Sequence, residues 1–370
     1  MENGSGTRID RRTLNRTALE RQWLLRREPR SALEAVRHLV AVQAQEPNPP
    51  YVGLWTRLAA FEKDDLARLL HGREVVRSSI LRGTQHMAAA EDFRWVRPLV
   101  QPVLERAWRG AFGKRNPGVD PEEAAKAAAE LLEGRTLTRP ELARLLAERW
   151  PDCDRTALGW LAQSMLPLIH EPPSGLWGRM GRTPFTLAEE WMGAPMEDGR
   201  PLADLIRRYL AAFGPASVRD FHAWSGLSRT REAFEELRPE LRTFTDETGR
   251  ELFDLPDLPL VPPDAEAPVR LLPELDNLLV AYHDRTRVMP DDIRRRVCVG
   301  AAVAPTVLVD GEVRAMWRVT EHETTTALTI EEFTPTRGET RGAVTEEAAR
   351  LLGFWSPEAA DYDIRFTRAE

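Results

Sequence analysis

Three successive segments of the sequence repeat one pattern: helical periodicity, a short turn, a second helical stretch, and then a ribbon of two short strands. In the third segment, helices are predicted near residues 201–213, 217–224 and 228–237, and strands at 241–245 and 251–255. Two helices joined by a turn and followed by a β-ribbon are the winged form of the helix-turn-helix. The pattern therefore predicts an α+β chain of tandem winged-helix units.

Two linkers separate the predicted units. Residues 110–121 are rich in glycine, proline and charge, and residues 256–268 are rich in proline, as is typical of connections between packed units. We therefore expect winged-helix units over residues 1–115, 116–198 and 199–257, and a mostly β C-terminal domain over residues 268–370. The expected elements are a ribbon at 75–87 in the first unit, helices near 121–132, 138–149 and 154–166 in the second, and in the last domain strands at 269–272, 278–283, 306–309, 313–319 and 324–333 with a helix near 345–353.

The first unit contains a helix with two amides at its end. Ser31 and Glu34 form a capping box that starts a helix near residues 31–43, and an apolar stripe follows on one face. Gln43 continues that stripe, and Gln45 follows in a Gln-x-Gln motif. Because Pro47 forces an extended exit, both carboxamides can turn toward one point, where they suit a water or a polar ligand.

This motif and its surroundings resemble the winged-helix DNA glycosylases of the AlkZ and YcaQ type. The likeness covers nearly the whole chain and is carried by the runs Leu39 to Pro47, Leu81 to His86, Arg208 to Ala216, Asp220 to Gly226, Leu275 to Leu279 and Asp284 to Arg287. The Gln-x-Gln form is similar to the azinomycin-resistance branch, whereas the YcaQ branch carries Gln-x-Asp. The resemblance implies catalytic roles for Gln43 and Gln45, a C-shaped channel around duplex DNA, and excision of bulky N7-alkylated purines. Unhooking of interstrand crosslinks and self-resistance to a genotoxic natural product also belong to that expectation.

Neutral amides restrict the chemistry that such a site can perform. Hydrolysis of an ordinary N-glycosidic bond needs a proton donor for the leaving base, which glutamine cannot supply. A purine alkylated at N7 already carries positive charge, so the enzyme need only extrude the nucleotide, place a water and stabilise charge on the sugar. Two amide oxygens can accept the hydrogens of that water. No lysine lies in the motif, although Lys63 could approach in space, and we expect a monofunctional enzyme.

Candidate DNA contacts lie mainly on the predicted wings. They are Trp55, Arg57, Arg77, Arg82 and His86 in the first unit, Arg179 and Arg182 in the second, and His283, Arg285 and Arg287 in a segment that matches a family hairpin. Each has a structural alternative. A tryptophan is more often part of a core, wing charges are often merely solvated, and Asp284 could pair with Arg285 to close a turn. Gln43 and Gln45 could likewise bond loop carbonyls at a helix end.

Charge is distributed unevenly along the chain, whose net charge is −7. Residues 1–115 carry 21 Lys and Arg against 13 Asp and Glu, whereas residues 116–370 carry 30 against 45. The first part thus has a net charge of +8, and it also holds the glutamine pair. Phosphate binding needs local rather than global positive charge.

Composition excludes several other classes. No apolar run is long enough to span a membrane, and the N-terminus lacks the apolar segment of a signal peptide. Cys153 and Cys298 are the only cysteines, and the 7 histidines show no ligand spacing, so no metal and no cofactor are expected. We expect a cytoplasmic, nucleoid-associated monomer whose partner is double-stranded DNA carrying alkylated bases.

The sequence thus favours a monofunctional DNA glycosylase of tandem winged helices. The main alternative is a winged-helix transcription regulator without catalysis, which would read bases in the major groove, typically as a dimer. A protein that sequesters a toxin is a third possibility. Release of free base from alkylated DNA distinguishes the first from the other two.

Overall fold

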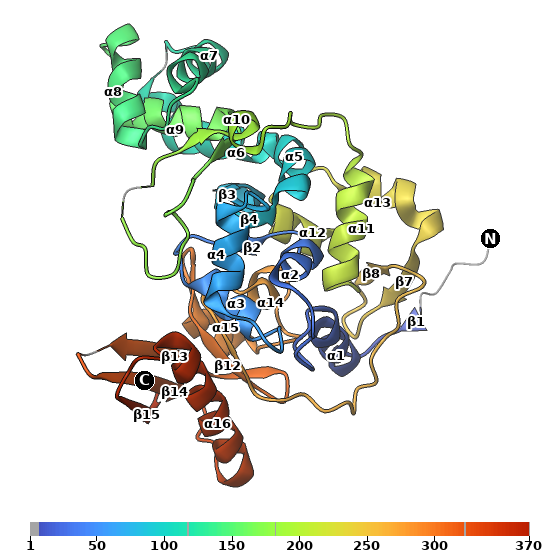
Figure 1. Ribbon diagram of the computed structural model, residues 1–370. Helices are drawn as coiled ribbons and strands as arrows, with labels where there is room; N and C mark the ends of the chain where they lie inside the picture. Colours follow the sequence, from blue (N-terminus) through green and yellow to red (C-terminus); the bar gives the residue numbers. More distant parts are fainter. Residues whose placement is uncertain (1–6, 117, 182, 322, 370) are drawn as a thin grey trace, which may run out of the picture.

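The computed structural model describes residues 7–116, 118–181, 183–321 and 323–369. It confirms the mixed α+β class, and it has an open outline in which two parts project from a central body on the same side of the view (Figure 1). One part is the helical group α7 (Pro121–Leu132), α8 (Arg139–Arg149) and α9 (Arg155–Met165), and the other is the C-terminal sheet. Within the described ranges, no helix is long and apolar enough to cross a membrane.

The first unit combines helices with a small sheet whose strand order is β2-β4-β3. The predicted ribbon is the β3–β4 hairpin. The elements are α1 (Arg11–Arg21), α2 (Ala32–His38), β2 (Val42–Gln43), α3 (Pro49–Trp55), α4 (Lys63–His71), β3 (Val75–Ser79), the 3₁₀ turn η1 (Leu81–Gly83) and β4 (Gln85–Ala89), followed by α5 (Ala90–Leu99), α6 (Gln101–Phe112) and the 3₁₀ turn η2 (Gly113–Arg115).

The helix that was expected to run to Gln43 ends earlier, so that expectation is wrong. Helix α2 stops at His38, and Val40 has a φ of 67°, which no right-handed helix accommodates. Gln43 then pairs with His86 of β4, and the Ala44 N–H donates to the Gln85 carbonyl oxygen at 2.8 Å. The tertiary ladder overrides the helical periodicity, and the motif therefore follows an edge strand rather than a helix.

The second and third units have their helices close to the predicted positions. Helices α7, α8 and α9 surround a separate core of alanine and leucine side chains, and the wing is reduced to two short strands, β5 (Leu168–Ile169) and β6 (Thr186–Leu187), followed by α10 (Ala188–Met192). The third unit consists of α11 (Leu202–Phe213), α12 (Val218–Ser225), α13 (Arg231–Leu237), the 3₁₀ turn η3 (Arg238–Glu240), β7 (Arg242–Thr245) and β8 (Glu251–Asp254), with β1 (Thr7–Arg8) added parallel to β7.

The C-terminal part is built on a five-stranded sheet with the order β15-β14-β13-β12-β9. The predicted strand at 278–283 is wrong: helix α14 (Asn277–Val280) lies there, because the Asp276 side chain caps it by accepting from the Leu278 N–H at 2.9 Å. The elements are β9 (Arg270–Leu272), α15 (Asp291–Val297), β10 (Cys298–Val299), β11 (Ala302–Val303), β12 (Thr306–Val309), β13 (Glu312–Glu321), β14 (Thr325–Glu332), α16 (Gly338–Trp355) and β15 (Asp361–Arg368).

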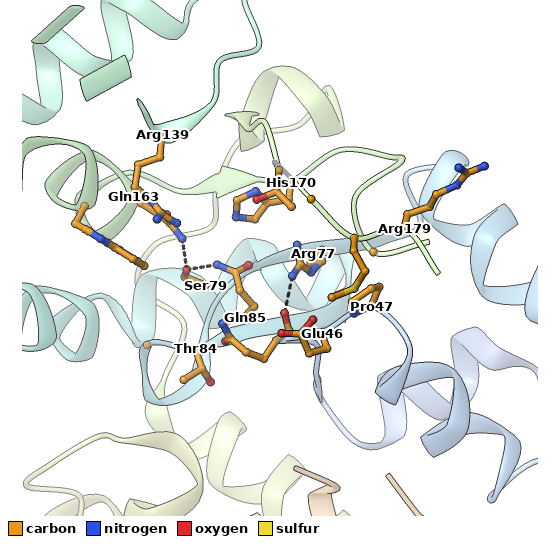
Figure 2. Close-up of a pocket in the computed structure, with 17 residues that line it drawn as sticks. Glu46, Pro47, Arg77, Ser79, Thr84, Gln85, Arg139, Gln163, His170 and Arg179 are labelled. Carbon is orange, nitrogen blue, oxygen red and sulfur yellow. Dashed lines mark hydrogen bonds between the residues drawn. The ribbon is translucent and has the colours of Figure 1, made fainter. Parts of the chain in front are cut away.

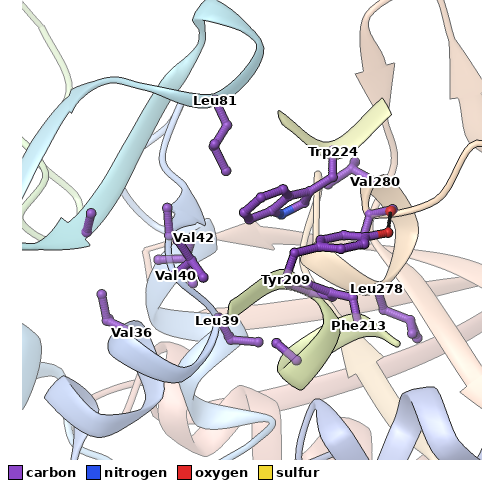
Figure 3. Close-up of a cluster of buried hydrophobic side chains, with 14 of the residues drawn as sticks. Val36, Leu39, Val40, Val42, Leu81, Tyr209, Phe213, Trp224, Leu278 and Val280 are labelled. Atoms are coloured by element: carbon purple, nitrogen blue, oxygen red, sulfur yellow. Dashed lines mark hydrogen bonds between the residues drawn. The ribbon is translucent and has the colours of Figure 1, made fainter. Parts of the chain in front are cut away.

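One hydrophobic core joins units that are far apart in the sequence. Figure 3 shows Leu39 and Val42 of the first unit beside Tyr209 and Trp224 of the third, with Leu278 of α14 in the same cluster. Burial of each such side chain stabilises the folded protein by roughly 1.5–3 kcal/mol. The segment that carries the glutamine motif is therefore held between the first unit, the third unit and the start of the C-terminal part.

Candidate active site

Gln43 is held by an arginine from the neighbouring turn. It is only 8% exposed, and its Oε1 accepts a hydrogen bond from Arg82 Nη2 at 2.5 Å. Arg82 lies in η1 with a φ of 54°, and its Nη1 donates to the Trp224 carbonyl oxygen of α12 at 2.7 Å. Burial, together with the positive charge of Arg285, lowers the Arg82 pKa to about 10. The guanidinium remains charged at neutral pH and fixes which end of the Gln43 amide faces it.

His86 supports the same arginine and is not a DNA contact, which corrects the sequence-based expectation. It is 1% exposed, and burial, with Arg82 beside it, lowers its pKa to about 3. The neutral ring has its Nδ1 at 2.9 Å from the Thr84 carbonyl oxygen and its Nε2 at 3.4 Å from Arg82 Nη2. Nδ1 therefore carries the proton and donates a hydrogen bond to the Thr84 carbonyl oxygen. Nε2 accepts a hydrogen bond from the guanidinium.

Arg77 holds the backbone of the motif. Its Nε donates to the Ala44 carbonyl oxygen at 3.0 Å and its Nη2 to that of Gln45 at 3.1 Å, while Nη1 donates to Ser174 Oγ at 2.8 Å. The side chain is 6% exposed, and burial lowers its pKa to about 10. Each of the three guanidinium nitrogens thus donates one hydrogen bond. Arg77 thus positions the motif against the second wing from a buried site, whereas the sequence predicted a DNA contact on the first wing.

Gln45 lies at a polar cavity of about 500 Å³ between the first two units, shown in Figure 2. We call it the arginine cavity because Arg77, Arg139 and Arg179 line it. His170 also lines it, and burial, with Arg77 nearby, lowers the His170 pKa to about 3, so this ring adds no charge at neutral pH. The side chain of Gln45 is exposed there. The arginine side chains around this cavity favour the binding of anionic groups such as DNA phosphates.

A second cavity of about 430 Å³ lies on the other side of the loop that follows Gln45. We call it the tryptophan cavity because Trp317 and Trp355 line it; Glu46 and Pro47 belong to the walls of both cavities. A third, much smaller space of about 10 Å³ is lined by Gln43 and Glu274, among others. That volume is roughly what one water requires. In this structure Gln45 thus lines the arginine cavity and Gln43 lines the water-sized space.

Arg57 is buried and Trp55 is half-buried, whereas the sequence predicted DNA contacts at both positions. Arg57 is 1% exposed and forms a bidentate ion pair with Asp276, with Nη1 at 2.7 Å and Nη2 at 2.8 Å from the carboxylate oxygens. Trp55 is half-buried, with the Arg27 guanidinium 4.5 Å from its ring centre and Phe354 stacked at 5.8 Å. Both residues tie the first unit to the C-terminal part.

The segment from His283 to Arg287 forms turns and not the expected hairpin; the two-stranded hairpin nearby is β10–β11. Arg287 is 7% exposed, stacks 3.9 Å from the Tyr282 ring centre and donates to the Pro215 carbonyl oxygen, so it has no surface to offer to DNA. Arg285 is half-buried and donates to Cys298 Sγ at 2.8 Å, while Asp284 pairs with Arg250 instead. His283 is exposed.

The second wing offers one described candidate. Arg179 is exposed at the edge of the arginine cavity, whereas Arg182 lies outside the described residues. Arg139, Gln163 and Glu274 line the cavities although sequence reasoning did not select them. No local pattern marks these residues, because only the packing of distant units brings them to the motif. In the described part of the chain, no group of three or more His, Cys, Asp or Glu side chains could hold a metal ion.

Comparison with known proteins finds relatives among the DNA glycosylases. The family model described as DNA glycosylase AlkZ-like matches residues 36–354. A relative described as an interstrand DNA cross-link repair glycosylase, from Streptomyces sahachiroi, is 28% identical over 359 residues, spanning 90% of this chain and 93% of the relative. The solved structure of the Streptomyces sahachiroi DNA glycosylase AlkZ superposes with a TM-score of 0.76 at 25% identity and covers 97% of this chain and 100% of that one.

Proposed function

The chain belongs to the AlkZ-like family of DNA glycosylases, and we propose that it is a monofunctional enzyme for bulky N7-alkylated purines in duplex DNA, including interstrand crosslinks. Its biological role would be self-resistance to a genotoxic natural product, and it would act as a nucleoid-associated monomer. The observation that carries the proposal is the neutral pair Gln43 and Gln45. Gln45 lines the cavity of about 500 Å³, Glu46 after it also lines the cavity of about 430 Å³, and Gln43 lines the water-sized space. The two larger spaces are large enough for a nucleotide with a sizeable substituent.

In this proposal Gln43 and Gln45 position the attacking water. Arg82 occupies one lone pair of Gln43 Oε1 and leaves the other free to accept from water. The bond from a guanidinium also holds the amide in one rotamer, which reduces the reorganisation needed in the transition state. A cationic base needs no proton donor, so two amides suffice for a labile N7 adduct.

The surroundings of Lys63 support a monofunctional reaction. A lyase step needs an amine that attacks the sugar carbon. The Lys63 ammonium donates to the Trp355 carbonyl oxygen at 2.7 Å and lies 4.1 Å from the Trp177 ring centre. Lys114 and Lys126, the other lysines of the sequence, belong to η2 and α7. None of the three is among the described residues that line the arginine cavity or the water-sized space.

The proposed DNA surface is the open side of the molecule, with phosphates at the arginine cavity. Arg179 stays in this proposal, as do His283, exposed, and Arg285, half-buried near Arg82. Arg229, just before α13, and Arg231, the first residue of α13, are also exposed. Arg57, Arg77, His86 and Arg287 are left out of the surface because they are buried.

Release of free base tests the proposal. Duplexes carrying N7-methylguanine, a bulky N7-alkylguanine or an N7–N7 interstrand crosslink are incubated with the enzyme, and the released base and any strand cleavage are measured separately. We expect release from all three duplexes without strand cleavage. Strand cleavage by the enzyme would contradict the monofunctional reaction. Binding without base release would favour a transcription regulator.

A further inference from the structure

The arginine cavity and the tryptophan cavity have opposite charge, although they share the loop after Gln45. Arg77, Arg139 and Arg179 line the first, against one carboxylate, Glu46. The second is lined by Glu46 and Glu274 against one cation, Arg318. On electrostatic grounds alone, a phosphate would therefore bind in the arginine cavity and a cationic base in the tryptophan cavity.

Of the two carboxylates that line the tryptophan cavity, Glu274 points more directly to a cationic ligand. It is half-buried, and burial, with Glu46 nearby, raises its pKa. Within the described ranges, no hydrogen bond or ion pair reaches its carboxylate, whereas Asp276, two residues on, is fully used by Arg57. A partly buried carboxylate without a partner is costly, and a bound cation would offset that cost.

The walls of the tryptophan cavity suit a flat aromatic ring. Trp317 Nε1 donates to the Leu272 carbonyl oxygen at 2.8 Å, and Trp355 Nε1 donates to Glu321 Oε1 at 2.7 Å. Both indole N–H groups are therefore satisfied outside the cavity, and the rings, which meet edge to face at 6.1 Å, offer carbon surface to a ligand. Aromatic walls attract the face of a cationic ring, and the carboxylates beside them attract its charge.

The cavity also lies within reach of the glutamine motif. Glu46 follows Gln45 directly and lines both large cavities, and Glu274 lines the water-sized space together with Gln43. A base held between these carboxylates would thus have its sugar next to the amides. The arginine cavity, on the far side of the same loop, would take the flanking phosphates.

We propose that the tryptophan cavity receives the extruded, positively charged alkylpurine, with Glu46 and Glu274 compensating its charge and Trp317 and Trp355 forming its walls. This assignment rests on the proposed glycosylase function and adds the binding site of the base. It assigns to Glu274 a contact with the substrate that its sequence context does not reveal.

The test measures binding rather than turnover. Two duplexes are compared, one with a 2′-fluoro-N7-methylguanine nucleotide, which keeps the charge but resists hydrolysis, and one with the uncharged 2′-fluoroguanine nucleotide. The intact wild-type protein should prefer the charged duplex. Glu274→Gln should reduce that preference about fivefold. Val319→Trp, which fills the cavity from β13, should abolish it.

Matched controls separate the possible outcomes. Glu339→Gln neutralises an exposed carboxylate at the start of α16, outside both cavities, and should change nothing. Glu339→Gln should bind undamaged duplex like the wild-type protein, and the affinity of each other variant for undamaged duplex is measured as its own reference. If the wild-type protein has no preference, or keeps it in Glu274→Gln and Val319→Trp, the cavity assignment is wrong. Release of N7-methylguanine by the wild-type protein, measured in parallel, reports on the proposed function independently.

Discussion

Arg82 donates a hydrogen bond to Gln43 Oε1 at 2.5 Å, and the same guanidinium donates to the Trp224 carbonyl oxygen of the third unit. The first glutamine of the motif is therefore oriented by a charged side chain that is itself anchored across a unit boundary. His86, held neutral by burial, accepts from the same Arg82 Nη2 at 3.4 Å. The amide of Gln43 thus has a defined orientation before any substrate binds.

The first prediction concerns the two amides. Gln43→Ala and Gln45→Ala should each lower single-turnover base release by ~10-fold or more, because contacts to the attacking water count most in the transition state. Duplex affinity should be nearly unchanged. Gln45→Asp should keep part of the activity, since a carboxylate also accepts from water. Two alanine variants with wild-type rates would remove the glutamines from the mechanism.

The second prediction concerns the coupling between Arg82 and Gln43. Arg82→Met and Gln43→Ala should each slow base release, and the double variant should be about as slow as Gln43→Ala alone, because the arginine acts through the amide. Single-turnover rates of the four proteins give the coupling energy. Fully additive effects would mean that Arg82 contributes to the reaction by another route, such as a phosphate contact.

The third prediction concerns the buried ion pair. Arg57→Ala should destabilise the protein by about 3–5 kcal/mol, because it leaves Asp276 buried without its partner. Urea denaturation measures the loss. Arg68→Ala, which removes an exposed ion pair with Asp65, should cost less than about 1 kcal/mol. A small effect at Arg57 would show that water reaches Asp276.

The fourth prediction concerns the first unit in isolation. A fragment of residues 1–115 should lose activity although it contains both glutamines. It lacks Asp276, the ion-pair partner of Arg57, and Trp224, whose carbonyl oxygen anchors Arg82. It also lacks the part of the shared core contributed by Tyr209 and Leu278. Circular dichroism and base release are measured together. A folded fragment with full activity would contradict the dependence of the site on the other units.

The fifth prediction concerns pH. Because the folded pKa of His86 is about 3, against about 6.5 when unfolded, only the unfolded chain takes up this proton between those values. Stability should therefore fall as pH falls below about 6.5, and His86 alone should account for about 2 kcal/mol between pH 7 and 5. His170 acts in the same direction. His86→Gln should flatten the pH dependence of unfolding, and His71→Gln, at an exposed site, should leave it unchanged.

Local signals were sufficient to predict much of the fold. Helices α7, α8 and α9 lie within one residue of their predicted positions, because Asp120, Thr138 and Asp154 cap them through contacts a few residues away. The winged pattern of the third unit and the Gln-x-Gln motif were likewise visible in the sequence. These features depend on contacts between residues that are close in the sequence. Hydrophobic periodicity and capping motifs report such contacts.

Tertiary structure alone decided the environment of each side chain. Periodicity extended a helix to Gln43, but a ladder with His86 makes it a strand. The strand predicted at 278–283 failed for a different, local reason, because Asp276 caps a helix there. Arg57 and Arg179 look alike in the sequence, yet one is buried against Asp276 and the other is exposed. Burial depends on contacts more than 200 residues apart, such as the 219-residue separation of Arg57 and Asp276. Such contacts leave no local pattern, so the sequence determined which residues carry chemistry and the packing decided which of them can reach a substrate.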